Sequence, residues 1–362
     1  MRRAISIAAL TLSGAAAALF APARSLSARV DAMSGAASLS PAPPPAALLR
    51  MRVRGMLTGM MAADSLSMPA HWFYSTYDID RVFGTIRNFE PAPARHPSSI
   101  MSLSNTGGAG RGKQSGSVIG DVICHGAKQY WGVPNMHYHR GMPAGSNTLN
   151  ALVARVLVRQ LAATGGEDAN AFFQAYIKFM TTPGSHNDTY AESYHRIFFA
   201  NYAAGKPPSA CAGDDGHNIA SAGGLVLLPP VAVLAAASQG ATAAGLAAVR
   251  QQRLTHASDD LAGYSAVYGQ LLGEVLLSAD PAGDMGAAGA ALRAAIVRAA
   301  RKLPGPKFDV AALVARGLAD REVIGPIFSP ACYIEGSARS LMYLVSNASG
   351  AEEGARAAGT LF

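Results

Sequence analysis

The sequence predicts an all-α protein, folded as a compact bundle of many helices. Hydrophobic residues make up 50% of the chain while aromatic residues make up only 7%, and 38 glycines interrupt Ala-rich segments. Such a composition is typical of helices joined by Gly/Pro loops rather than of a β-sandwich. Apolar residues recur with helical spacing along most of the chain, whereas the alternation expected of strands is almost absent.

The positive charge is concentrated near the start of the chain. The whole sequence has a net charge of +7, and residues 1–54 carry seven arginines against one acid, Asp31. The remaining residues therefore have a net charge of only +1. A folded body without excess positive charge does not attract polyanions, so no nucleic-acid partner is expected.

Residues 1–45 are predicted to be a targeting leader followed by a disordered linker. Met1-Arg2-Arg3 precedes an uncharged run over residues 4–23, and a stretch rich in Ser, Ala and Pro follows. The arginines, the serines and the scarcity of acids favour an organellar transit peptide, directed to a mitochondrion or plastid and then removed. One alternative is a secretory signal, because the small residues near Ala21-Pro22-Ala23 fit a cleavage site. The other alternative is a retained membrane anchor.

A single helical domain is expected over residues 46–362. Its opening helix is expected to start near Ala46, where apolar residues begin to recur at helical spacing. Residues 71–120 are expected to be mostly loop, because prolines and a Gly/Ser-rich stretch break any pattern. Further helices are expected at residues 148–163, 167–181, 188–204, 220–238, 241–253, 258–278, 286–302, 309–319 and 335–347.

One segment is apolar enough to be compared with a membrane span. Residues 219–238 are uncharged over twenty residues, which is long enough to cross a bilayer. The Pro229-Pro230 pair and the many small residues of this segment favour a buried core helix instead. No stable membrane span is therefore expected in the mature chain.

Residues 107–114 come within one residue of a phosphate-binding loop. Gln114 stands where that loop needs a Mg²⁺-binding hydroxyl, and the preceding Ser102–Asn105 does not have the pattern of a buried strand. A flexible surface loop is the favoured interpretation.

The histidines and cysteines do not have the spacing of a zinc site or of a disulfide framework. His137 and His139 alternate, so in an extended loop they point to opposite sides. His186 and His195 are nine residues apart, outside the i, i+4 spacing of a helical metal pair. The three cysteines are an odd number without CxxC spacing. The histidines are interpreted as hydrogen-bonded polar residues.

Polar clusters stand beside several predicted helix ends. Exposed backbone N–H groups at helix starts favour anions and capping side chains. Capping and turn formation explain any one cluster, but four of them in one helical domain favour a ligand site. The four clusters are Ala63–Leu66, His137–Thr148, Ser185–Thr189 and Asp214–Asn218.

Four of the chain's segments follow one another in a recognisable order. Arg54–Leu66 has a helical pattern and ends in Ala63-Asp64-Ser65-Leu66. Gly145-Ser146-Asn147-Thr148 directly precedes the next strong helical pattern. Two later segments, Asp214–Pro230 and Ala331–Ser337, lead into further predicted helices.

In this order the four segments resemble those of the ADP-ribosylglycohydrolase family. The first is similar to the family's opening helix, with its Ala/Gly-Asp-Ala-Leu-type end, and the second occupies the place of a Thr-Asp-Asp-Thr metal motif. The third is similar to the central ligand loop and the following helix, and the fourth to the segment before the last helices. The likeness runs from about Val53 to Arg356 and is to a divergent branch with Asn-Thr in place of the acidic pair.

The resemblance implies a bundle with two Mg²⁺ ions at one end, which hold the ribose hydroxyls and polarise the anomeric carbon. Carried over, the metal-binding residues are Asp64, Asn147 and Thr148. Only neutral oxygens remain in the second segment, so Mg²⁺ is expected to bind weakly. His71 stands near the place of a further acidic ligand. The C-terminal metal motif is degraded, and its nearest equivalent is Gly350-Ala351-Glu352.

The function that the resemblance implies is hydrolysis of a glycosidic bond at ribose in ADP-ribosylated substrates. Water would attack the anomeric carbon with help from a carboxylate base. The expected catalytic residues are Asp64, Asp214 and Asp215, and Asp188 is a further candidate for the base. The expected ligand-binding residues are Asn147, Thr148, His186, Asp188, His217 and Asn218.

Two alternatives remain beside this hypothesis. One is a catalytically inactive pseudoenzyme that keeps the cleft and binds ADP-ribose or a related nucleotide, which the missing carboxylates motivate. The other is a structural role without a ligand, which the four polar clusters disfavour. The partner expected of the enzyme and of the pseudoenzyme is an ADP-ribose-containing small molecule or a modified protein.

Overall fold

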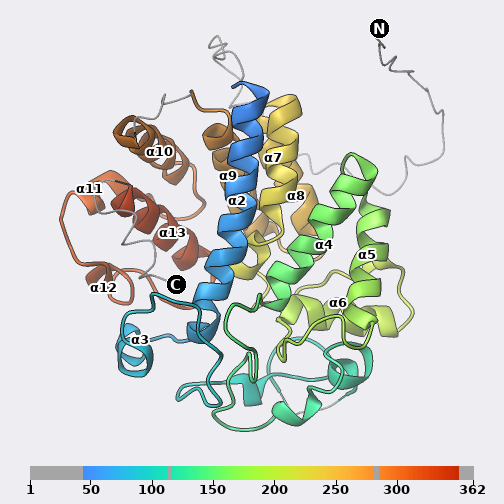
Figure 1. The fold of residues 1–362 in the computed structure, drawn as a ribbon. Coiled ribbons are helices and arrows are strands. Elements are labelled where there is room, and N and C mark those ends of the chain that lie inside the picture. Colours follow the sequence, from blue (N-terminus) through green and yellow to red (C-terminus); the bar gives the residue numbers. More distant parts are fainter. Residues whose placement is uncertain (1–43, 113–115, 280–284, 350–362) are drawn as a thin grey trace, which may run out of the picture. The chain divides into compact units, whose positions relative to one another are not determined.

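The computed structural model describes residues 44–112, 116–279 and 285–349. Within these ranges the chain forms α-helices, short 3-10 segments and loops, with no β-sheet (Figure 1). The predicted all-α class is therefore confirmed. The leader predicted over residues 1–45 lies outside the described residues except at its end.

The helices have the following bounds in chain order. The α-helices are α2 Ala46–Ser67, α3 Thr76–Phe83, α4 Leu149–Thr164, α5 Ala169–Thr181, α6 Ser193–Ala203, α7 Leu228–Gln239, α8 Ala241–Arg253, α9 Asp259–Leu276, α10 Met285–Ala300, α11 Val310–Val314, α12 Asp320–Val323 and α13 Ile334–Ala348. Short 3-10 helices lie at Met68–Ala70, Met101–Leu103, Lys128–Tyr130, Pro208–Ala210 and Ala222–Leu225, and a kinked π-helical turn at Val118–Val122.

Two helices begin later than their periodicity predicts. The helix predicted from residue 188 begins at Ser193, because the preceding residues are extended and Asp188 directs its carboxylate to other N–H groups. The helix predicted from residue 220 begins at Leu228, with prolines in its first turn. Proline is tolerated there because the first N–H groups of a helix have no partner within the helix.

Two predictions of segment type were incomplete. The predicted loop over residues 71–120 contains α3, whose start is capped by the Ser75 hydroxyl and which has no fully buried residue. The helix predicted at 309–319 is short and is followed by the separate α12, because Gly317 adopts a positive φ of 62° between them. Helix α3 has only eight residues, fewer than the window of about 11–18 residues in which a helical period is recognised.

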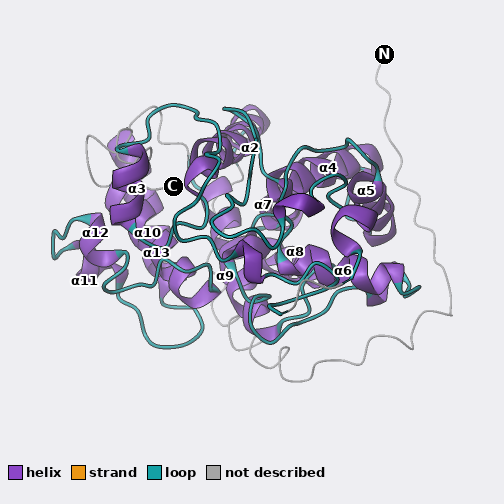
Figure 2. Cartoon of the chain, turned by 90° about the horizontal axis from the view of Figure 1, so that it is seen from below, coloured by secondary structure: helices purple, strands orange, loops and turns teal. Residues whose placement is uncertain are grey.

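Helices α2, α7, α8 and α9 pack together, with α4–α6 on one side and α10–α13 on the other (Figures 1 and 2). Helices α8 and α9 approach closely through glycine. A Cβ on Gly269 would lie 2.7 Å from the carbonyl oxygen of Ala244, and one on Gly245 would lie 2.7 Å from that of Ala266. Only glycine allows backbones this near to each other.

Helix α7 lies within this packing. Among the described residues one stretch, Ala222–Gln239, has the length and hydropathy of a membrane span, and 61% of it is buried within the protein. Most of the first two turns of α7, including Val231 and Ala232, is inaccessible to solvent. This burial fits the predicted core helix.

The connections gather where α2 ends and where α4 and α6 begin. Figure 2, viewed from that end, shows the long loops crossing in front of the helix ends. Three of the polar clusters therefore meet at this end of the bundle, where Asp64 and Asp188 both contact the start of α4.

Candidate active site

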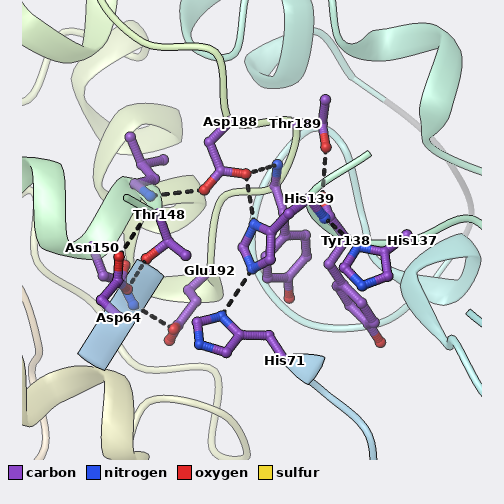
Figure 3. A network of polar contacts seen from close by, with 12 residues as sticks. Asp64, His71, His137, Tyr138, His139, Thr148, Asn150, Asp188, Thr189 and Glu192 are labelled. Atoms are coloured by element: carbon purple, nitrogen blue, oxygen red, sulfur yellow. Dashed lines mark hydrogen bonds and ion pairs between the residues drawn. The ribbon is translucent and has the colours of Figure 1, made fainter. Parts of the chain in front are cut away.

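Two carboxylates from distant parts of the chain cap the first turn of α4 (Figure 3). Asp64, near the end of α2, accepts hydrogen bonds from the backbone N–H of Thr148 at 2.8 Å and from its hydroxyl at 2.6 Å. Asp188, in the loop before α6, accepts from the backbone N–H of Leu149 at 2.7 Å. The first N–H groups of a helix lack partners and lie at the positive end of its dipole, so both carboxylates are stabilised there.

Asn147 completes this cap. Its Nδ2 donates to the carbonyl oxygen of Met61 at 2.7 Å, to Oγ of Ser65 at 2.9 Å and to Oδ2 of Asp64 at 3.0 Å. Burial raises the pKa of Asp64, although the hydrogen bonds from Thr148 and Asn147 lower it in part. The structure thus brings together the three residues that were expected to bind a metal.

Asp188 also pairs with a buried histidine. Its Oδ1 lies 2.8 Å from Nδ1 of His139, and Nε2 of His139 lies 3.0 Å from Nδ1 of His71. Burial alone would lower the pKa of His139, but the charge of Asp188 raises it above its ordinary value. Burial and the charge of His139 lower the pKa of His71 to about 3. His139 therefore donates to both neighbours, and neutral His71 donates from Nε2 to Oγ of Ser67 at 3.0 Å.

The predicted catalytic pair Asp214 and Asp215 lies in a surface turn. Asp214 is exposed and accepts from the N–H of Gly216 at 2.8 Å. Asp215 accepts from the N–H groups of His217 at 3.1 Å and Asn218 at 2.6 Å. Burial would raise the pKa of Asp215, but the hydrogen bonds from Asn218 lower it below its ordinary value. In this structure both carboxylates stabilise the turn.

The remaining predicted ligand-binding residues are divided between two places. His217 is exposed, and its Nε2 lies 2.7 Å from the hydroxyl of Tyr333. Asn218 and Tyr333 line a cavity. His186 lies elsewhere, against the ring of Phe179 with centroids 5.7 Å apart, and burial lowers its pKa. The structure therefore brings Asn218, but not His186, to the cavity wall.

This cavity has a volume of about 280 Å³. Its wall adjoins the network of Figure 3, because Tyr138 and Glu192 belong both to the lining and to the residues labelled there. One carboxylate, that of Glu192, lies in the lining. The aromatic residues of the lining are Trp72, Tyr74, Tyr138, Tyr190 and Tyr333, and its polar residues include Ser104, Arg111, Glu192, Ser193, Arg196, Asn218 and Ser221.

Glu192 immediately precedes α6 but does not cap that helix. Its Oε1 instead accepts a hydrogen bond of 2.5 Å from Nδ2 of Asn150, on α4. The carboxylate lies against Gly223, where a Cβ would be 2.6 Å from Oε1 and still closer to Oε2. Burial raises the pKa of Glu192, while Asn150 and the charge of Arg196 lower it in part. Glu192 is thus a carboxyl group on the cavity wall with a weakened tendency to ionise.

A family comparison supports the resemblance found in the sequence. The model of the family described as ADP-ribosylglycohydrolase matches residues 45–342, from the start of α2 into α13. The chain belongs to the ADP-ribosylglycohydrolase family. No curated protein matches it.

In this family member, the residues at the start of α4 fit a Mg²⁺ site poorly. A hard cation needs oxygen lone pairs, whereas both oxygens of Asp64 already accept from N–H or O–H donors, and Asn147 turns its amide nitrogen inward. Across the described residues, no three or more His, Cys, Asp or Glu side chains lie together as ligands for a metal ion. Residues 350–352, the degraded acidic motif, lie outside the described part of the chain.

The glycine-rich segment before α4 is held by a buried arginine. Nε of Arg196 donates to the carbonyl oxygen of Gly108 at 3.1 Å, and the guanidinium also reaches that of Gly110 at 3.4 Å. The guanidinium carbon lies 5.3 Å from the centre of the Trp131 ring and 5.8 Å from that of Tyr190. The carbonyls of Gly108 and Gly110 thus face a cation, whereas a phosphate-binding loop directs N–H groups toward an anion.

Sequence reasoning missed Glu192 and the aromatic wall. The aromatic residues are scattered between residues 72 and 333, and no spacing connects them. One signal was present: Asp188 and Glu192 are two acids within five residues directly before a helical pattern. Such a pair is ordinarily interpreted as capping, and only the fold reveals that Asp188 caps α4 whereas Glu192 lies on the wall of a cavity.

Proposed function

We propose that this ADP-ribosylglycohydrolase family member hydrolyses a glycosidic bond at ribose in ADP-ribosylated substrates, with Glu192 as the general base. Family membership supports a hydrolase of this kind. The observation that carries the assignment of the base is the half-buried carboxylate of Glu192 on the wall of the aromatic cavity. Burial raises its pKa, and a carboxyl group with a raised pKa is a better proton acceptor once ionised.

The lining of the cavity has groups suited to the part of such a ligand around the reacting ribose. Arg111 provides a positive charge for the adjoining diphosphate, and flat rings such as Trp72 and Tyr190 offer apolar faces for the sugar. Asn218 offers an amide for hydroxyl groups. The volume of about 280 Å³ is near the lower limit for ligand pockets, so we propose that it accommodates the reacting ribose and its immediate neighbours.

The proposed reaction needs a single water and a single base. Glu192 takes a proton from the water while the oxygen of the water forms a bond to the anomeric carbon. The bond from that carbon to the leaving nitrogen or oxygen breaks, and its electron pair remains on the leaving group. Protonated Glu192 then returns its proton to the leaving group or to solvent. Since the cap residues fit Mg²⁺ poorly as they lie, no step depends on a metal ion.

The test measures release of free ADP-ribose from a mixed ADP-ribosylated protein substrate. Glu192→Gln keeps the shape and the acceptor for Asn150 but cannot take a proton, so activity is expected to fall by at least about 100-fold. Fluorescence titration with ADP-ribose is expected to give a dissociation constant close to that of the parent. Equal rates in the parent and in Glu192→Gln would contradict the proposal.

A second candidate function is a binding module without turnover. The observation in its favour is that Asp64 and Asp188, two of the candidate bases, serve as helix caps. The same assay separates the two candidates. Saturable ADP-ribose binding with no release of product, in Mg²⁺ and in EDTA alike, would favour the binding module, whereas release in either solution would favour the hydrolase.

A further inference from the structure

A row of buried polar side chains leads from the interior of the bundle to Glu192. The hydroxyl of Tyr176, on α5, lies 2.6 Å from Nδ1 of His195, on α6. Nε2 of His195 lies 3.1 Å from Oδ1 of Asn150, on α4, and the hydroxyl of Tyr194 donates to the same oxygen at 2.8 Å. Asn150 then donates to Oε1 of Glu192 at 2.5 Å.

The chemistry of these groups fixes the direction of every hydrogen bond in the row. The carbonyl oxygen of Asn150 can only accept, so the Nε2 atom of His195 carries the hydrogen. Burial lowers the pKa of His195 well below its ordinary value, so the ring is neutral and its Nδ1 accepts from Tyr176. A reversed Asn150 amide would set its oxygen against the ionised carboxylate of Glu192, where two acceptors would face each other without a hydrogen. The row therefore holds Asn150 with its amide nitrogen toward Glu192.

Burial makes this arrangement rigid. His195 and Tyr176 have no solvent exposure, and Tyr194 is only 2% exposed. The ring of Tyr194 also stacks between His195 and His256, with centroids 3.9 Å and 4.1 Å away. An unpaired polar group at this depth is unfavourable by about 1–3 kcal/mol, so a reversed amide is strongly disfavoured.

We propose that Tyr176, His195 and Asn150 act as a positioning relay that holds the carboxylate of Glu192 in its orientation on the cavity wall and stabilises its ionised form. This inference rests on the proposed role of Glu192 as general base. The three residues are positioning residues, because they act through Glu192. The titratable and charged groups that face Glu192 are His139, Asp188, Tyr190, Tyr194, Arg196 and Cys332.

The experiment reads the ionisation of Glu192 directly. The full chain contains only eight glutamates, so ¹³C labelling of their side-chain carboxyl groups gives a simple NMR titration, and the signal lost in Glu192→Gln identifies Glu192. Asn150→Asp removes the N–H donor and adds a second carboxylate. The pKa of Glu192 is expected to rise by at least about one unit, a tenfold change in the acid constant.

A milder variant tests the far end of the relay. Tyr176→Phe removes one hydroxyl and leaves the ring in place, and it is expected to move the pKa of Glu192 in the same direction by about threefold in the acid constant. In the pH profile of kcat/KM, the acid limb is expected to move to higher pH in both variants. The matched control is Tyr343→Phe, which removes a hydroxyl that donates to Leu318 in another part of the core and is expected to move neither.

The outcomes separate the relay from the proposed function. An unchanged Glu192 titration in both Asn150→Asp and Tyr176→Phe would overturn the relay, whatever the activity. The relay would also be overturned if Tyr343→Phe shifted the pKa of Glu192 as much as Tyr176→Phe does. Normal activity of Glu192→Gln would overturn the role of Glu192 as base, while the NMR titration would still decide whether the relay controls its ionisation.

Discussion

The carboxylates at the start of α4 and the carboxylate before α6 occupy opposite environments, although all three are acids beside a helix start. Asp64 and Asp188 accept several hydrogen bonds each, from backbone N–H groups and from side chains of Thr148 or His139. Glu192 accepts one, from Asn150, and lies on a cavity wall. Hydrogen bonds favour the ionised form of a carboxylate and occupy its lone pairs, so Glu192 has more lone pairs left to accept a proton than Asp64 or Asp188.

The comparison separates the family-like motif from the proposed general base. The motif at Asn147 and Thr148 is preserved in place and in contact with Asp64, yet its chemistry is that of a cap. The group that we propose as the general base, Glu192, is hydrogen-bonded to the first turn of the same helix, α4, at Asn150. Substitutions in the two regions are therefore expected to separate stability from activity.

The largest effect is expected from Asp188→Asn. This change leaves His139 buried without its anion, and breaking a buried ion pair on one side destabilises a protein by about 3–5 kcal/mol. Urea unfolding of the purified chain measures the loss. The control is Asp168→Asn at the exposed cap of α5, where asparagine caps as well as aspartate and little change is expected. Equal, small effects of the two changes would show that the buried pair contributes nothing.

The next effect is a loss of stability in acid. Burial lowers the pKa of His71, His137 and His256 to about 3 in the folded chain. At His71 and His137 the charge of His139 adds to this effect. Below about pH 6.5 the unfolded chain binds protons that these histidines refuse, so stability falls by about 1.4 kcal/mol per pH unit for each. The contribution of His139 depends on pH in the opposite direction, because its pKa is raised in the folded chain. This contribution to stability is complete below the ordinary pKa of histidine and is lost as the pH rises through the raised pKa.

Urea unfolding at about pH 7, 6 and 5 measures this dependence. His256→Gln is expected to make the decline shallower by one proton, because that histidine no longer titrates on unfolding. A free energy of unfolding that stays constant from pH 7 to pH 5 would contradict the assignment of neutral histidines to the folded chain.

A smaller effect, confined to activity, is expected from Gly223→Ala. The new Cβ would lie 2.6 Å from Oε1 of Glu192, so the carboxylate has to move. Misplacement of a catalytic group is expected to lower kcat by about tenfold or more. Gly166→Ala is the control, since no atom lies within 4 Å of its added Cβ. The placement of Glu192 would be wrong if the two variants released ADP-ribose at the same rate.

The smallest effect is expected from the double change Asp214→Asn with Asp215→Asn. Asparagine retains an oxygen that accepts from the turn N–H groups, so ADP-ribose release is expected to change by less than about threefold. This measurement also tests the original expectation that the pair is catalytic. If the double variant lost as much ADP-ribose release as Glu192→Gln, the general base would be Asp214 or Asp215 instead.

Periodicity was sufficient for the helices that bury an apolar face. The helix predicted at 241–253 has those bounds, and α4 begins one residue after its predicted start. The errors fall where another interaction competes with helix formation: Asp188 serves another helix, and proline occupies the first turn of α7. These are contacts between segments far apart in sequence, and a local pattern does not contain them.

Only part of the candidate site could be predicted from the sequence. Asp64, Asn147 and Thr148 were found because their motifs are contiguous, and their contacts confirm that they meet. The cavity was not found, because its wall consists of side chains from loops whose paths depend on anchors such as Arg196. Neither charge nor spacing marks that arginine as buried before the fold is known.

The closure of the α4 cap has a consequence for folding kinetics. Asp64 and Thr148 are 84 residues apart in the chain, and Asp188 and Leu149 are 39 apart. Contacts across such separations require long loops to close, so they are expected to form after the helices themselves. Substitutions at the cap should therefore speed unfolding more than they slow folding. This junction is expected to form after its helices as the chain folds and to open before they do as the chain unfolds.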